Sequence, residues 1–133
     1  MKLITRNTDY AIRALCFIAS GKEDVVPVSR LVKELKIPRP FLRKTLQSLT
    51  QSGLIISYKG KGGGFSLGKN LNKIFLLDLI KIFQGPMKLN ECLFKGKICP
   101  NQTRCALKSK IDAIEKNVVK ELSNITIGSL LKK

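Results

Sequence analysis

The segment that decides the fold of this chain runs from Ser29 to Leu67 and reads SRLVKELKIPRPFLRKTLQSLTQSGLIISYKGKGGGFSL. Up to Ser52 its apolar residues recur three or four positions apart, the spacing of one helical face. A β-prone run, Leu54–Tyr58, follows, and after the glycine-rich stretch 59–64 the chain returns through a second short β-prone piece. This order predicts two helices and then a β-hairpin.

The helical part predicts two short helices joined by a tight turn. Residues 29–35 form the first helix, and residues 40–52 form the second, which begins at Pro40 and ends before Gly53. Proline suits a first helical position because the N–H that it lacks would have no partner there. Two helices in this arrangement make a helix-turn-helix, whose second helix can enter the major groove of DNA.

The surface of these two helices supplies candidate contacts to DNA. Apolar residues from Phe41 to Leu49 set one face of the second helix, and arginine, lysine and glutamine occupy other positions. Arginine can form two hydrogen bonds to guanine, and glutamine can form two to adenine. A solvated helix face gives the same pattern and stays open as the alternative. The candidate DNA contacts are Ser29, Arg39, Phe41, Arg43, Lys44 and Gln47.

The predicted hairpin directly after the second helix has the form of a "wing". Its tip, KGKGGG, carries Lys59 and Lys61, which can meet phosphates or a minor groove. Gly62 and Gly63 join them as candidates, because glycine allows positive φ and a close approach of the backbone. A phosphate-cradling nucleotide loop is the alternative, but GKGGGF lacks the GK[ST] order and the helix that must follow it.

Two further helices are predicted on either side of this segment. Residues 4–20 place alanine, leucine and isoleucine on one helical face and end at Gly21. Cys16 in this helix is interpreted as a small buried hydrophobe rather than a ligand. Residues 72–84 are apolar, are predicted to form one helix and stop at Gly85-Pro86.

A long helix is predicted over residues 104–123, with Thr103 as its N-cap. Its apolar residues form an a/d-like stripe suited to packing on a partner helix. Packing on the chain's own domain is the alternative. A homodimer is favoured, because a helix-turn-helix usually reads two half-sites by symmetry. The candidate dimerisation residues are Leu107, Ile111, Ile114, Val118 and Leu122.

The fold class that follows is mainly α with a small β wing. We expect a winged helix-turn-helix domain over residues 1–84, a cysteine sensor loop over 85–105, and a dimerisation helix with a C-terminal tail over 106–133.

Charge and composition narrow the class of function. The formal net charge is +16, and residues 1–75 carry 14 basic and 4 acidic residues, so a polyanionic partner is expected, nucleic acid before membrane. No apolar run approaches the length of a membrane span, and no secretory segment is seen, so a cytoplasmic location is expected. The chain has no histidine, no paired-carboxylate motif and no nucleophile–base arrangement, so we do not expect an enzyme.

Three cysteines lie within the stretch CLFKGKICPNQTRC, from Cys92 through Cys99 to Cys105, with the spacing C-x6-C-x5-C. Thiolates are soft ligands that favour iron–sulfur clusters, zinc or Cu(I). Their odd number and a reducing compartment disfavour disulfides. Structural zinc usually shows tighter cysteine pairs and needs a fourth ligand. The residues themselves leave an iron–sulfur centre, zinc and unligated thiols open.

The order of these motifs resembles one known family. TDYAIRAL near the start, the helix-turn-helix, the wing KGKGGGFSLGK, the three cysteines and NITIGSLL near the end are similar to the IscR/NsrR-type winged-helix regulators, the "Rrf-two" family. The resemblance spans nearly the whole chain. It implies a dimeric bacterial transcription factor that binds an operator in double-stranded DNA. Many members bind an iron–sulfur cluster and report iron–sulfur status, iron, nitric oxide or redox state, while others lack the cysteines.

The resemblance also implies a ligand set. Cys92, Cys99 and Cys105 match the cluster-ligating positions, although the first gap is one residue longer than in the best-known members. Lys108 stands where IscR-type members carry a ligating histidine, so that ligation is excluded. NsrR-type members use an aspartate from the first helix of the other protomer, and Asp9 matches it. A [4Fe–4S] or [2Fe–2S] cluster is therefore expected, with Asp9 from the partner protomer as the candidate fourth ligand.

Two alternatives remain at this point. The first is a winged-helix repressor of the same family that senses through its thiols or has no cluster. The second and more distant one is a basic RNA-associated zinc-binding protein. The sequence leaves open the operator, the target genes, the signal and whether the protein represses or activates.

Overall fold

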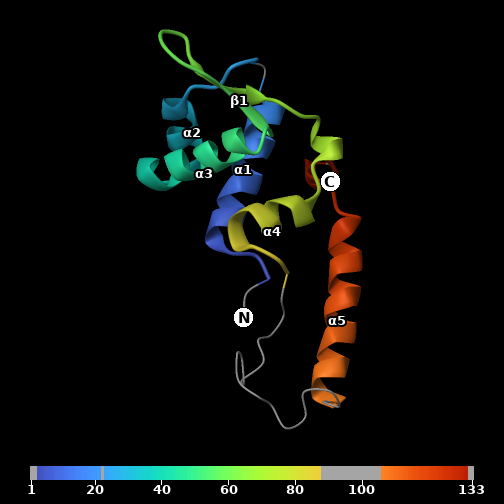
Figure 1. Ribbon diagram of the computed structural model, residues 1–133. Coiled ribbons are helices and arrows are strands. Elements are labelled where there is room, and N and C mark those ends of the chain that lie inside the picture. Colours follow the sequence, from blue (N-terminus) through green and yellow to red (C-terminus); the bar gives the residue numbers. More distant parts are fainter. Residues whose placement is uncertain (1–2, 22, 88–105, 132–133) are drawn as a thin grey trace.

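The computed structural model describes residues 3–21, 23–87 and 106–131 (Figure 1). The cysteines Cys92, Cys99 and Cys105 and the predicted N-cap Thr103 lie outside the described residues, as does most of the predicted sensor loop.

The described chain is mainly helical with one two-stranded antiparallel sheet, as predicted. Tyr58 on the first strand pairs with Gly64 on the second. Val26 adds a single bridge on the other side, where its N–H donates to Phe65 O at 2.8 Å. The elements in chain order are α1 (Arg6–Ser20), α2 (Val28–Leu35), α3 (Arg39–Gln51), β1 (Ile55–Tyr58), β2 (Gly64–Leu67), the 3-10 turn η1 (Leu71–Lys73), α4 (Leu76–Gln84), α5 (Ala106–Ser123) and α6 (Ile127–Leu131).

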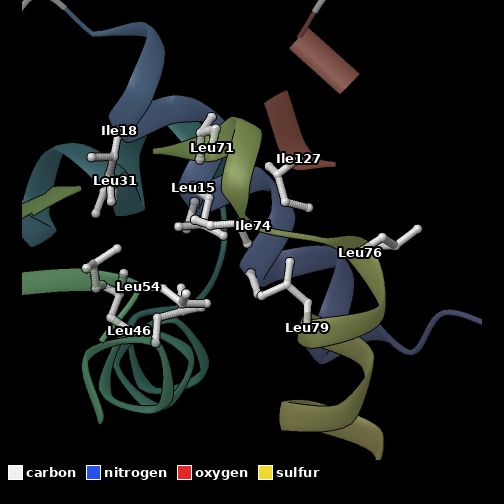
Figure 2. Close-up of a cluster of buried hydrophobic side chains, with 14 of the residues drawn as sticks. Leu15, Ile18, Leu31, Leu46, Leu54, Leu71, Ile74, Leu76, Leu79 and Ile127 are labelled. Carbon is white, nitrogen blue, oxygen red and sulfur yellow. The ribbon is translucent and has the colours of Figure 1, made fainter. Parts of the chain in front are cut away.

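Helix α1 lies at the centre of the fold. Its apolar face is fully or almost fully buried, with Ala11, Ala14 and Leu15 at 0% exposure, which confirms the helical spacing read from the sequence. The helix packs against α2, α3, α4, α6 and β2. Figure 2 shows Leu15 and Ile18 of α1 beside buried side chains from the other elements. The position of α3 therefore depends on α1.

The helix-turn-helix forms as predicted: α2 starts one residue earlier than expected and ends at the expected residue, and both ends of α3 lie one residue earlier than expected. Leu31 of α2 and Leu42 and Leu46 of α3 are completely buried and hold the two helices together. Helix α2 ends at Leu35, and its C-cap residue Lys36 adopts the left-handed conformation with φ 56° and ψ 37°. Glycine or asparagine usually occupies such a position, because a Cβ crowds the backbone there.

The prediction of a single helix over residues 72–84 was wrong. The chain forms the 3-10 turn η1, then two extended residues, Ile74 and Phe75, and only then α4. These residues pair with the segment before α6: Ile127 N–H donates to Ile74 O at 2.8 Å, and Leu76 N–H donates to Ile125 O at 2.9 Å. Long-range backbone pairing replaces the helical hydrogen bonds that the local apolar pattern favours.

Helix α5 is attached to the rest of the fold mainly through its C-terminal end. Leu122 is 5% exposed and belongs to the core, and Val118 packs partly against that core. Figure 1 shows the other end of α5 running away from the helices and the sheet. Within the ranges that the structure describes, no helix is long and apolar enough to cross a membrane.

Candidate nucleic-acid interface

Helix α3 presents a cationic face to solvent. Its buried residues are Leu42, Thr45, Leu46 and Leu49. The predicted contacts lie at other positions of the helix and are all exposed: Arg39, Phe41, Arg43, Lys44 and Gln47. Phe41 is 54% exposed, so its expected place in the apolar face of this helix was wrong. An exposed ring at the start of the helix is available to contact a thymine methyl group.

The cations of this face have no acidic partner among the described residues. Helix α3 contains no aspartate or glutamate. Ion pairs among the described residues join Asp9 to Arg13 and Glu23 to Arg30, and Arg39, Arg43 and Lys44 take no part in them. The charges of Arg39, Arg43 and Lys44 are therefore not neutralised within the described chain, and they produce a positive potential that attracts polyanions.

The start of α2 is a second exposed feature that is suited to a phosphate. Ser29, the second residue of the helix, is exposed as predicted. No side chain of the described residues caps this end of the helix, and a helix N-terminus attracts phosphate through its N–H groups. The neighbouring Arg30 is engaged elsewhere, because it pairs with Glu23 and lies over the ring of Phe17 at 5.7 Å from the centroid.

The tip between β1 and β2 has a backbone that only glycine suits. Gly60 and Gly62 have φ values of 89° and 79°, in the left-handed region. At Gly63 an added Cβ would lie 2.3 Å from Tyr58 O, so the two sides of the tip could not approach as they do. The exposed side chains of Lys59 and Lys61 extend from this narrow tip. The tip is thin enough to approach a DNA groove, while contacts by Gly62 and Gly63 stay a prediction.

Asp9 lies in the first turn of α1, where its carboxylate Oδ2 is 3.0 Å from Arg13 Nε. Both side chains are substantially exposed, so the carboxylate is accessible to a further ligand from outside the protomer. Among the described residues no group of three or more histidine, cysteine, aspartate or glutamate side chains could hold a metal ion. The predicted cysteine ligands cannot be placed, since they lie outside these residues.

Cys16 is half-buried rather than fully buried, which corrects its interpretation as a core residue. Burial raises the pKa of its thiol by desolvating the thiolate. The neutral form is a poor nucleophile and a poor metal ligand.

The a/d-like stripe of α5 divides into two parts. Leu107 is 68% and Ile114 is 50% exposed, and Ile111 between them is partly exposed. Val118 and Leu122 instead contact the chain's own core, so at this end the stripe packs on its own domain. The exposed part is an apolar helix face that no other described element covers.

A polar cluster that sequence reasoning missed joins α1 to α4. Thr8 is 0% exposed, and its hydroxyl donates to Gln84 Oε1 at 2.6 Å. The signal was present in the sequence, because Thr8 stands three residues before Ala11 on the apolar face of α1. A hydroxyl in such a position needs a buried partner.

Comparison with known proteins identifies the family. A family model described as "Rrf2: Iron-dependent Transcriptional regulator" matches residues 4–133. The chain belongs to the Rrf2 family of transcriptional regulators. The Rrf2 chain is 33% identical, over 124 residues, to a protein of Aquifex aeolicus (strain VF5) that is provisionally named an HTH-type transcriptional regulator. The match covers 92% of the Rrf2 chain and 86% of that protein.

Solved structures share the fold of this Rrf2 chain. CymR (YrzC), the global cysteine regulator of B. subtilis, matches with a TM-score of 0.76 and 22% identity over 98% of this chain and 97% of CymR. T. potens IscR matches with a TM-score of 0.75 and 22% identity over 99% of this chain and 87% of IscR. These matches confirm the predicted winged-helix fold, and the family confirms the expected function in transcription regulation through DNA binding.

Proposed function

We propose that this Rrf2 protein reads an operator in double-stranded DNA as a homodimer, with α3 in the major groove and the β1–β2 tip against the backbone or minor groove. The observation that carries the reading role is the exposed face of α3. Its three cations, Arg39, Arg43 and Lys44, have no acidic partner among the described residues. Gln47 on the same helix adds a side chain able to bond adenine with two hydrogen bonds.

A dimer is supported by α5. Leu107 and Ile114 are large apolar residues that remain 68% and 50% exposed, respectively. They belong to a stripe with a/d-like spacing, and an uncovered face of this kind is stabilised by burial against a second helix. A second copy of the chain also supplies the second reading helix that a two-half-site operator requires.

The reading role can be tested without knowing the operator. Duplexes are selected from a random-sequence pool with the wild-type protein, and affinities for the selected and unselected duplexes are measured by fluorescence anisotropy. Lys44→Ala and Gln47→Ala should reduce the preference for the selected duplex, because base contacts carry the sequence information. A preference unchanged in both variants would contradict the placement of α3 in the groove.

The sensing role is proposed for Cys92, Cys99 and Cys105, which together hold an iron–sulfur cluster. The donor chemistry fits, since the three thiols are soft ligands and the Asp9 carboxylate is exposed and paired with Arg13. An iron–sulfur cluster supplies a centre whose assembly responds to iron, oxidants or nitric oxide. Asp9 completes the set from the partner protomer, so the cysteine segment of one chain is tied to α1 of the other.

Iron and acid-labile sulfide measured after anaerobic isolation test this assignment. The wild-type protein should contain both, and the Cys99→Ser variant should lose them. Asp9→Ala should remain folded and should alter the visible spectrum of the bound cluster. Thiol-based sensing in place of a cluster would give a colourless protein whose DNA affinity changes when the same cysteines are oxidised.

A further inference from the structure

The side-chain amide of Gln84 fastens the end of α4 to the beginning of α1. Its Oε1 accepts hydrogen bonds from Thr5 N–H at 2.9 Å and from Thr8 Oγ1–H at 2.6 Å. Its Nε2 donates to Leu3 O at 3.1 Å. One amide thus makes three hydrogen bonds to the N-terminal turn and the residues before it. We call this group, Leu3, Thr5, Thr8 and Gln84, the amide clamp.

The amide clamp resists separation of its two halves. Thr8 is fully buried, so its hydroxyl cannot exchange Gln84 for water without opening the interface between α1 and α4. A buried hydroxyl that loses its acceptor is destabilising. Its other polar neighbour is Thr5 Oγ1 at 3.2 Å, which moves with the same helix end. Displacement of Gln84 therefore displaces the start of α1.

One residue of the clamp, Gln84, lies in the sequence between the DNA-reading helix α3 and the proposed cysteine sensor. Gln84 is the last residue of α4 and stands eight positions before Cys92 in the sequence. On the other side, α1 packs directly against α3, whose exposed face carries the candidate base contacts. Hydrogen bonds of the clamp therefore join the end of α4 to the start of α1, and packing of α1 against α3 continues the connection to the DNA-reading helix.

We infer that the amide clamp transmits the chemical state of the cysteines to DNA affinity, with Gln84 as its positioning residue. The inference rests on the proposed sensing function and specifies the path of its regulation. A change at the cysteines shifts Gln84, Gln84 shifts the N-terminal turn of α1, and α1 shifts α3 relative to its counterpart in the dimer. Two half-sites about 34 Å apart then no longer match both reading helices equally well.

The test asks whether the hydrogen bonds of the amide clamp are needed for the state of the cysteines to change DNA affinity. Thr8→Val removes only the hydroxyl and keeps the shape of the side chain, and Gln84→Met removes all three hydrogen bonds of the amide. Thr126→Val is the matched control, because its Oγ1 accepts from Ser129 N–H at 3.1 Å far along the sequence from the clamp. DNA affinity is measured for reduced, metal-free protein and after anaerobic incubation with ferrous iron and sulfide, using a duplex selected by the wild-type protein. Hydrogen exchange of the first turn of α1 is recorded in both states.

We expect the ratio of the two affinities to fall by about two- to thirtyfold towards one in Thr8→Val and Gln84→Met. The difference in hydrogen exchange between the states should disappear with it, while Thr126→Val keeps both at wild-type values. Folded clamp variants that keep the wild-type ratio would overturn the inference and leave the sensing function intact. If Gln84→Met does not fold, Thr8→Val decides alone. A wild-type ratio of one would instead refute the sensing function, and the clamp's role with it.

Discussion

Removing the two lysines of the β1–β2 tip should weaken DNA binding in a salt-dependent and sequence-independent way. Lys59 and Lys61 are exposed, and neither belongs to an ion pair found among the described residues, so each is available to a phosphate. The affinity of a protein for duplex DNA falls with salt because phosphate contacts release counterions, with a slope of about −0.9 per contact on logarithmic axes.

The expected change in the salt dependence of DNA affinity follows from the number of lysines in the proposed dimer. The double variant Lys59→Ala/Lys61→Ala removes two cations per protomer and four per dimer. If each cation meets one phosphate, the slope should become shallower by about 3.6, and by about 1.8 if only one tip is engaged. The preference for a selected duplex over a random one should stay the same, since phosphate contacts carry no sequence code.

Fluorescence anisotropy titrations at several salt concentrations measure this slope. The control is Lys110→Ala/Lys120→Ala on α5, which changes the net charge by the same amount. These lysines are exposed, and Figure 1 shows α5 on the other side of the fold from α2, α3 and the sheet. An unchanged slope in the tip variant would refute the proposed phosphate contacts. An equal change of slope in the control would show that the effect depends only on the net charge of the protein.

Three further outcomes are expected. Arg43→Ala should lower the preference for the selected duplex by about 1–3 kcal/mol, and competition titrations that show no change would exclude base readout at this position. Lys36→Gly should raise thermal stability. Relief of the left-handed strain, about 1–2 kcal/mol, exceeds the extra backbone entropy that glycine loses on folding, about 0.5–1 kcal/mol. The control Lys33→Gly, in the last turn of α2, should lower thermal stability because its backbone is helical. Leu107→Asp/Ile114→Asp should give folded monomers in sedimentation experiments, and a persistent dimer would show that partners meet elsewhere.

The sequence predicted the elements whose local pattern and tertiary environment agree. The apolar face of α1 is one example, since burial on one side requires apolar residues at helical spacing. The glycine-rich tip is another, since positive φ at Gly60 and Gly62 favours glycine. The same reasoning failed at Ile74 and Phe75. There the backbone pairs with residues about fifty positions later, and no local periodicity encodes that partner.

The candidate interface was predicted better than the candidate sensor. Exposure of Arg43 and Gln47 follows from the spacing of apolar residues. The same spacing placed Phe41 on the buried face of the helix, although its side chain is exposed. The amide clamp was missed because it depends on two helices meeting at Thr8 and Gln84. The ligand roles of the three cysteines stay predictions, since these residues lie outside the part that the structure describes.

We propose that the cysteine stretch holds a cluster whose state controls DNA binding. The most direct measurement is the absorption spectrum of anaerobically isolated protein, taken with its affinity for a selected duplex, before and after addition of nitric oxide. We expect visible charge-transfer bands that nitric oxide bleaches and a change in DNA affinity that follows the bleaching. A protein that stays colourless after anaerobic reconstitution with iron and sulfide, with DNA affinity indifferent to nitric oxide, would contradict it.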